Sequence, residues 1–175
     1  MDRGPNLGPL PQPLALLCAL MVPTSLLCPP ALSEANTLNN RQPVVWGQLA
    51  LLCVRAGRLP EAEQAIEHAY KLDLAESPLL TALASALHAA GKWGACERAA
   101  RRAISVAAAT GADPTGAQRA LGDALYELGQ YEGSLAAFRA ALDAGAADAV
   151  AEHCRAQAGM LLSAHLGRPD EAAAL

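Results

Sequence analysis

The sequence predicts an all-α fold of stacked helix pairs, and three observations support this. Apolar residues make up 53% of the 175 residues, but aromatic residues only 3%. Much of the apolar content is alanine, which is the strongest helix former and lets helices approach closely. Glycines recur in similar settings at intervals of 34 and then 38 residues. A period of that length is typical of helical repeats, so we expect a solenoid.

Four glycines mark the turn inside each predicted helix pair. A small residue follows each of them at a distance of five residues. Glycine just past the end of a helix suits a left-handed C-cap. With each glycine at position 15 of a 34-residue unit, the repeats cover 43–76, 77–110 and 115–148, and a partial repeat covers 153–175. The glycines are Gly57, Gly91, Gly129 and Gly167, and the small residues are Ala62, Cys96, Ser134 and Ala172.

The first helix of each unit, helix A, has a predicted core face at positions 4, 7, 8 and 11. These positions follow the i, i+3, i+4, i+7 spacing of one helical face. They hold Trp46, Leu49, Ala50 and Cys53, then Leu80, Leu83, Ala84 and Leu87, then Gln118, Leu121, Gly122 and Leu125, and last Ala156, Gly159, Met160 and Ser163. Helix B contributes positions 24 and 27, which hold Ile66, Ala69, Ala100, Ala103, Phe138 and Ala141.

Prolines mark the predicted helix starts. Ser77-Pro78 and Asp113-Pro114 each place a capping side chain before a proline, which the first turn tolerates. The four residues 111–114 are expected to lengthen the turn between the second and third units. Residues 149–152 contain neither glycine nor proline. We expect them to lengthen helix A of the fourth unit, with Asp148 as its cap.

The two ends of the chain complete the predicted organisation. Residues 1–30 are expected to form a flexible or apolar leader, and residues 31–42 a half repeat. The apolar run at 14–22 is too short to span a bilayer, so no integral membrane span is expected. Ser33-Glu34-Ala35 loosely resembles a signal cleavage site, whereas five prolines up to Pro23 argue against one. A cleaved leader and a flexible one both stay open. Because neither end supplies a polar cap, we expect a piece of a longer solenoid or a chain that relies on a partner.

These features resemble the tetratricopeptide repeat (TPR) family. The best match is the third unit, LGDALYELGQYEGSLAAFRAAL, in which Tyr131 follows the turn glycine. The resemblance implies a helix-turn-helix solenoid of about three full repeats plus partial repeats at both ends, which binds proteins without catalysing a reaction. The stretch 38–74 is also similar to the repeats of cilia- and flagella-associated TPR proteins. That similarity implies an axonemal scaffold in cilium assembly or motility.

A stack of this kind is expected to bind its ligand along helix A. Positions 2, 5, 9, 12 and 13 then face the groove, where an extended peptide or a helix can dock. The alternative is that these side chains are only solvated. The candidates are Gly47, Leu51, Val54 and Arg55, then Thr81, Ser85 and His88, then Arg119, Asp123, Tyr126 and Glu127, and last Gln157, Leu161 and His165.

One binding mode of the family is not expected. Chaperone adaptors of this family hold a terminal carboxylate with a lysine and two asparagines. The matching positions here are Gly47, Leu51 and Ala82. Without the clamp, we do not expect these repeats to hold chaperone tails.

Charge and cysteine content argue against several function classes. The net charge is −4, and the densest basic cluster, Arg98, Arg101 and Arg102, shares its helix with Glu97. A solvated face explains that cluster better than nucleic-acid binding. The five cysteines are odd in number and form no CxxC pair. This argues against a disulfide framework and a structural zinc site, and it fits a reducing compartment.

The sequence carries no recognisable catalytic signature. It has neither an HExxH motif nor a phosphate-binding loop that ends in GK[ST]. Cys154 and His165 lie too far apart along one helix to share a metal. We therefore expect no enzymatic activity and no cofactor. The expected partner is a protein or peptide, with axonemal components included, and the expected location is the cytoplasm, including the cilium. A secreted or membrane-associated repeat protein and a regulatory fragment of a larger enzyme are the alternatives.

Overall fold

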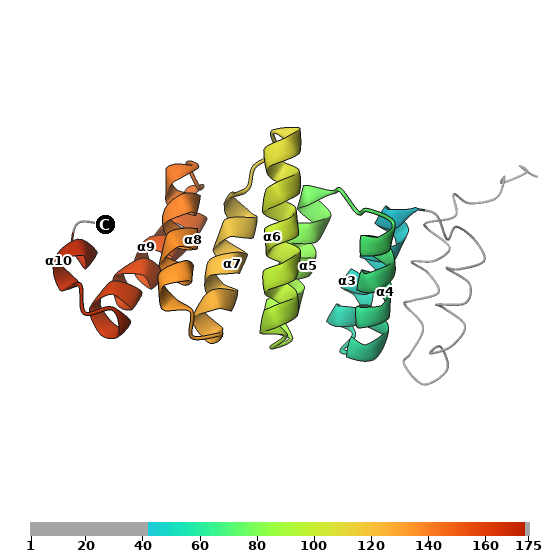
Figure 1. Cartoon of the computed structure of the whole chain (residues 1–175), viewed down its shortest axis with the longest axis horizontal. Helices are drawn as coiled ribbons and strands as arrows, with labels where there is room; N and C mark the ends of the chain where they lie inside the picture. Colours follow the sequence, from blue (N-terminus) through green and yellow to red (C-terminus); the bar gives the residue numbers. More distant parts are fainter. Residues whose placement is uncertain (1–41, 174–175) are drawn as a thin grey trace, which may run out of the picture. The chain divides into compact units, whose positions relative to one another are not determined.

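The computed structural model describes residues 42–173 (Figure 1). The predicted leader at 1–30 lies outside the described residues, as does the half repeat at 31–42 except for its last residue. Every regular element within 42–173 is helical, which confirms the predicted all-α class. The chain divides into two compact units. The first runs to Cys53 and continues over Arg58–Leu74, and the second holds Val54–Gly57 and the chain from Ala75 onward.

The first unit holds α3 (Pro43–Arg55) as far as Cys53, together with α4 (Leu59–Lys71). The indole of Trp46 stacks on the imidazole of His68, with ring centroids 4.7 Å apart. Alanines at Ala50, Ala62 and Ala69 are buried. Small residues at these positions let two helices approach closely, while Trp46, Leu49, Ile66 and Leu74 supply the larger buried side chains.

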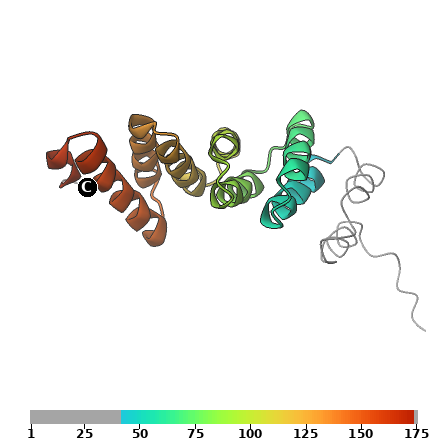
Figure 2. The ribbon, with the colours of Figure 1, turned by 90° about the horizontal axis from the view of Figure 1, so that it is seen from below.

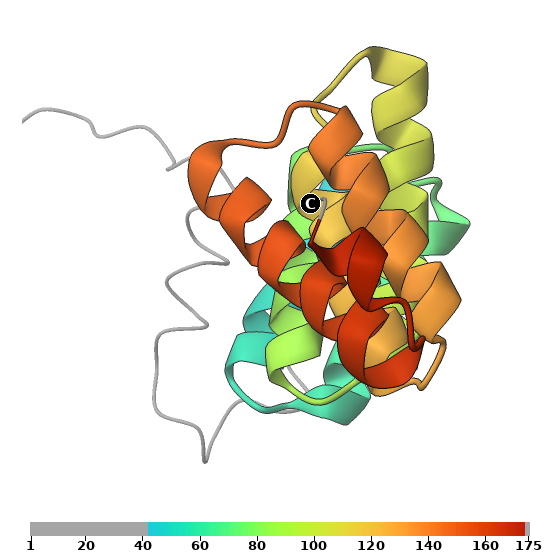
Figure 3. The ribbon, with the colours of Figure 1, turned by 90° about the vertical axis from the view of Figure 1, so that its left-hand side faces the viewer.

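The second unit continues the pattern of helix pairs. Its elements are α5 (Ser77–Ala89), α6 (Trp93–Thr110), α7 (Thr115–Glu127), α8 (Tyr131–Asp143), α9 (Asp148–Met160), the π-helix η1 (Leu161–His165) and α10 (Pro169–Ala172). Helix α5 packs on α6 and α7 packs on α8, while contacts of α6 with α7 and of α8 with α9 join the pairs. Helix α7 also contacts both α5 and α9. Figures 2 and 3 show this succession from below and from the C-terminal side.

The turn glycines have the predicted left-handed conformation. Gly57, Gly91, Gly129 and Gly167 have φ between +62° and +73°. After α5, the backbone N–H of Gly91 donates to the carbonyl of His88, and the N–H of Lys92 donates to that of Leu87, both at 2.9 Å. This pair of bonds is a Schellman motif, which satisfies carbonyls that a helix end leaves without partners.

The predicted core positions of the first three units are buried, apart from a partly buried Gln118. The register of the fourth unit is wrong: Ala156, Met160 and Ser163 are exposed and Gly159 is only partly buried. Helix α9 and η1 bury another set, Ala151, Cys154, Ala158, Leu161 and Leu162. Most of that set packs against Leu135, Phe138 and Ala141 of α8.

The predicted register of the fourth unit is wrong because its positions are counted back from Gly167. The π-helix Leu161–His165 lies between that glycine and the body of α9. A π-helix has a wider turn than an α-helix, so counting by α-helical spacing through it reaches the wrong face. In addition, α10 is only four residues long, so it offers little surface to cover the opposite face of α9.

Two expectations about helix ends need correction. The residues 111–114 do not lengthen a turn, because the alanine-rich α6 runs on to Thr110 and is 18 residues long, against 13 for α4 and α8. Neither Ser77 nor Asp148 is a cap: each is the first residue of its helix, after Glu76 and Ala147. The Ser77 hydroxyl instead donates to the carbonyl of Ala103 at 3.3 Å.

Of two other expectations about helix ends, one is met in part and one is confirmed. The N-cap residue of α7 is Pro114 rather than Asp113, but the Asp113 carboxylate does bond the helix start. Asp113 accepts hydrogen bonds from the backbone N–H of Thr115 at 2.9 Å and from its hydroxyl at 3.0 Å. It therefore satisfies the first N–H of α7. Residues 149–152 belong to α9, which is 13 residues long like α5 and α7, and the five residues of η1 continue it, so helix A of the fourth unit is longer as predicted.

Ion pairs hold α10 against α8. Glu171 accepts hydrogen bonds from Arg139 at 2.8 Å and from Arg168 at 2.6 Å. The bond from Arg139, with that from Arg168, lowers the pKa of the Glu171 carboxyl below its usual value. These contacts order the short last helix, which has no buried residue of its own.

Candidate functional site

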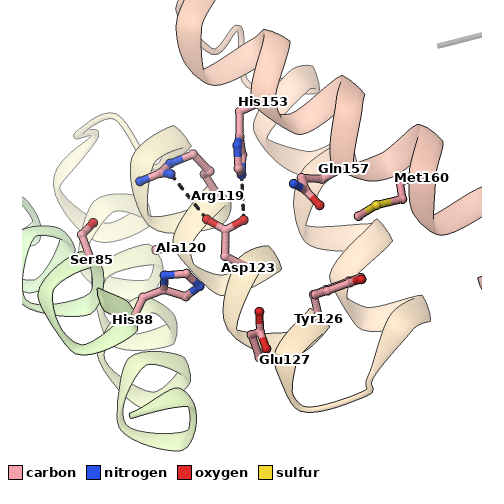
Figure 4. A pocket seen from close by; sticks show the side chains of 10 residues that line it. All are labelled: Ser85, His88, Arg119, Ala120, Asp123, Tyr126, Glu127, His153, Gln157 and Met160. Carbon is pink, nitrogen blue, oxygen red and sulfur yellow. Dashed lines mark hydrogen bonds and ion pairs between the residues drawn. The ribbon is translucent and has the colours of Figure 1, made fainter. Parts of the chain in front are cut away.

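A cavity of about 300 Å³ lies in the second unit between α5, α7 and α9 (Figure 4). We name it the α7 cavity, because α7 supplies half of its lining. The lining residues are Ser85 and His88 from α5, Arg119, Ala120, Asp123, Tyr126 and Glu127 from α7, and His153, Gln157 and Met160 from α9. Three consecutive A helices thus contribute side chains to one concave site.

Asp123 forms the polar centre of the α7 cavity. One carboxylate oxygen lies 2.7 Å from Nε2 of His153, and the other lies 3.4 Å from Nη1 of Arg119 (Figure 4). The Asp123 side chain is only 12% exposed. Both of its oxygens therefore have partners, and the contact with His153 joins α7 to α9. An arrangement fixed in this way is preorganised for a ligand.

An aromatic cluster positions Tyr126 at the cavity wall. The rings of Tyr131 and His165 stack with centroids 4.2 Å apart. Tyr126 meets His165 edge-on at 5.6 Å and Tyr131 at a tilt at 5.9 Å. The Tyr126 hydroxyl also lies 3.4 Å from Nε2 of His165. Contacts on two sides restrict the rotamer of Tyr126 before any ligand binds.

The rim of the cavity is more open. Glu127, the last residue of α7, is exposed, and within residues 42–173 it has no ion-pair partner. Met160 is 39% exposed on α9, and such a flexible apolar side chain adapts to different partners. The α7 cavity therefore offers a carboxylate, an aromatic ring and an apolar contact side by side.

Two buried cysteines lie beneath this surface. Burial raises the pKa of the Cys96 thiol to about 12, and the charge of Asp123 adds to the effect. Burial also raises the pKa of Cys154, again with a contribution from Asp123. The Cys96 thiol donates a hydrogen bond to the carbonyl of Ala120 at 3.6 Å. Because the thiolate is the reactive form, both cysteines act as core residues rather than nucleophiles.

Most of the predicted groove residues of the second and third units line the α7 cavity. These are Ser85, His88, Arg119, Asp123, Tyr126 and Glu127, and Gln157 of the fourth unit joins them. Leu51 and Arg55 lie on α3 and Thr81 on α5, outside the lining. Gly47, Val54 and Leu161 are buried, so their assignment to a groove surface is wrong. Leu161 fails because the fourth register was displaced.

Sequence reasoning missed His153 and Met160 as lining residues. His153, Gln157 and Met160 follow Arg119, Asp123 and Tyr126, each by 34 residues. Their own spacing of four and then three residues places them on one face of α9. Adding 34 to the numbers of the α7 candidates Arg119, Asp123 and Tyr126 would have identified all three lining residues of α9.

The lining of the α7 cavity mixes charged, polar and aromatic side chains. Among residues 42–173, no three side chains of histidine, cysteine, aspartate or glutamate are grouped to hold a metal ion. In the same range, no helix is both long enough and apolar enough to cross a membrane. The mixed polar and aromatic surface on successive A helices can contact a bound segment at several points.

Comparisons with known proteins give a consistent result. Residues 29–161 match the family described as the cilia and flagella-associated protein 70 C-terminal domain. Cilia- and flagella-associated protein 70 from Macaca fascicularis and that from Homo sapiens are each 54% identical to this chain over 50 residues. That segment is 29% of this chain but only 5% and 4% of those proteins.

A solved structure supports the fold. The N-terminal domain of stress-induced protein-1 from C. elegans matches with a TM-score of 0.56 at 15% sequence identity. The match covers 66% of this chain and 93% of that domain. At this identity the likeness shows the helical repeat fold alone, and it confirms the TPR-type solenoid that the glycine spacing predicts.

Proposed function

Because the chain belongs to the family of the cilia and flagella-associated protein 70 C-terminal domain, we propose that it is a non-catalytic scaffold of the cilium or flagellum. It holds a protein partner in the α7 cavity, and components of the axoneme are the partners we propose. Its location is the cytoplasm and the axoneme. The family match supports the ciliary part of the proposal, and the cavity supports the binding part.

The observation that carries the binding part is the contact of Asp123 with both Arg119 and His153. This contact fixes polar groups of two A helices around one concavity before a ligand arrives. A nearly buried carboxylate with charged or polar partners gives directional contacts, while Tyr126 and Met160 give apolar area. Aromatic residues, methionine and arginine are enriched at protein interfaces, so this lining suits a bound peptide segment.

The proposal is tested by filling the α7 cavity with a neutral side chain. Ser85→Trp places an indole at the α5 wall of the cavity. Ala136→Trp is the matched control, since Ala136 is exposed on α8 and does not line the cavity. The tagged full chain and both variants are expressed in ciliated cells, immunoprecipitated, and compared by quantitative mass spectrometry and by fluorescence localisation. Circular dichroism checks that all three are folded.

We expect axonemal proteins to accompany the wild type and Ala136→Trp but not Ser85→Trp, and we expect the wild type to locate to the cilium. If Ser85→Trp retains the same partners, the cavity is not the binding site. If the partners and the location are non-ciliary, the ciliary part of the proposal is wrong.

A further inference from the structure

The position of Glu127 is unfavourable for the stability of α7. It is the last residue of the helix, and the last turn of α7 contains no basic residue. The C-terminal end of a helix carries a partial negative charge, so a carboxylate there is repelled and a cation is attracted. Glu127 is nevertheless exposed at the α7 cavity, where no ion pair within residues 42–173 compensates its charge.

The other charges of the α7 cavity already have partners. Asp123 engages Arg119 and His153, so the single guanidinium of the lining is neutralised by the buried carboxylate. Glu127 is therefore the charge left for a ligand. Helix α5 ends at Ala89, directly after the lining residue His88, so a second helix C-terminus lies beside the same cavity.

Tyr126 adds an aromatic face next to this carboxylate. It precedes Glu127 in α7, and Figure 4 shows both side chains at the same end of the cavity. Contacts with Tyr131 and His165 hold its ring in place. A ring face beside a carboxylate attracts lysine and arginine side chains through cation–π and charge interactions together.

We propose that the α7 cavity selects partners with a lysine or arginine side chain, which Glu127 and the ring of Tyr126 hold at the C-terminal end of α7. This inference rests on the proposed function and names the chemistry of the segment that binds. A segment that ends in acidic residues would meet repulsion from Glu127 and from both helix ends, so the site discriminates against it.

The test uses small probes that need no known partner. Nα-acetyl-lysine N-methylamide, which keeps its ammonium group, is titrated into the ¹⁵N-labelled full chain, and binding is followed by amide chemical shifts. A final concentration of ~50 mM is enough to detect a weak contact with a single side chain. The matched glutamate and glutamine derivatives serve as acidic and neutral probes. Glu127→Gln removes the proposed contact, and Glu67→Gln makes the same change at an exposed residue of α4 that does not line the cavity.

We expect the lysine probe to shift amides at Tyr126, Glu127 and Gln157 and to bind about fivefold more weakly to Glu127→Gln, consistent with one partly exposed charge contact. Glu67→Gln should bind as the wild type, and added salt should weaken the binding. The inference is overturned if the acidic probe binds equally well, if the shifts lie outside the cavity, or if no shift occurs. If the lysine probe causes no amide shift but Ser85→Trp still loses the protein partners, this inference alone is overturned. If Ser85→Trp keeps its partners, the proposed function is overturned.

Discussion

Replacing Gly122 by alanine would place a methyl group against the ring of Phe138. A Cβ built on Gly122 would lie 2.5 Å from Cε1, 2.7 Å from Cδ1 and 2.8 Å from Cζ of that ring. Phe138 is completely buried and packs in the cluster that joins α8 to α9. Any shift of the ring would therefore have to displace the side chains that pack around it. The Gly122 carbonyl also accepts a 2.7 Å hydrogen bond from the buried Ser134 hydroxyl, which fixes α8 against this turn of α7.

The magnitude follows from two opposing effects. Overpacking a core by one methyl group costs about 1–3 kcal/mol. Replacing a helical glycine by alanine otherwise gains about 0.5–1 kcal/mol, because the unfolded chain loses freedom. We therefore expect Gly122→Ala to lower the free energy of unfolding by roughly 0.5–2 kcal/mol. The other units agree with this reasoning, because they pair alanine at the same position with smaller partners, Ala50 with Ile66 and Ala84 with Ala100.

A double-mutant cycle isolates the contact. Phe138→Leu alone leaves a void and should cost roughly 1–2 kcal/mol. In Gly122→Ala combined with Phe138→Leu, the smaller side chain leaves room for the new methyl group. The double variant should then be more stable than the sum of the single changes by about 1 kcal/mol. Urea denaturation followed by circular dichroism measures the three variants, and equal slopes show that the denatured state is unchanged.

Gly159→Ala is the matched control for this cycle. Gly159 is also helical, but a Cβ there would have no atom within 4 Å. It should therefore stabilise the protein by about 0.5–1 kcal/mol. The reasoning is refuted if Gly122→Ala stabilises as Gly159→Ala does, or if the cycle shows no coupling between Gly122 and Phe138.

Four further outcomes are expected. Gly129 has φ +72°, and no atom lies near a Cβ added there, so Gly129→Ala introduces backbone strain alone. It should lower the free energy of unfolding in urea by about 1–2 kcal/mol, and an unchanged stability would contradict the assigned turn. Glu127→Gln removes a repelled charge from the end of α7 and should stabilise by about 0.3–1 kcal/mol at low salt, with a thermal melt at high salt showing a smaller gain. The pKa of Glu171, lowered by the bond from Arg139, should rise toward the usual value in Arg139→Gln in an NMR titration; the associated stability is present above the usual carboxyl pKa and is lost as pH falls through the lowered one. Burial raises the pKa of the Cys96 thiol to about 12, so the stability linked to its protonated form is present below pH 9.0 and is lost as the pH rises toward 12. Rapid iodoacetamide labelling of Cys96 itself in the native protein at ~pH 8, located by peptide mass spectrometry, would contradict this.

The fold class follows from features that act locally. A glycine at the end of a helix needs no distant contact to adopt positive φ, so Gly57, Gly91 and Gly129 mark their turns reliably. The face that a helix buries follows from α-helical spacing as long as the helix is regular. The π-helix Leu161–His165 breaks that spacing, and no local residue pattern predicts it. The length of α6 is a different case, because residues 111–114 are expected to lengthen a turn, whereas the extra residues extend the alanine-rich helix as far as its C-cap Gly111.

The lining of the candidate site divides in the same way. Ser85, Asp123 and Tyr126 face the cavity because they occupy regular turns of regular helices. The contact of Asp123 with His153 joins residues 30 positions apart, and it depends on how α9 is turned against α7. That rotation is set by the packing of Cys154 and its neighbours on α8, so no spacing rule within one helix determines it.

The lining residues of α7 and α9 keep a constant interval of 34 residues. An added residue therefore has a different effect outside the lining turns than within them. The two 38-residue intervals between glycines show that the fold accommodates extra residues. These residues lie at the C-terminal end of α6 and in the segment formed by α9 and η1. One residue added near Thr110 would extend an exposed helix end and leave the lining in phase. One residue added between Arg119 and Tyr126 would turn the later side chains by about 100° around the helix axis and out of the cavity. The chain can therefore vary in length between its binding turns while the order of the contacts it presents stays the same.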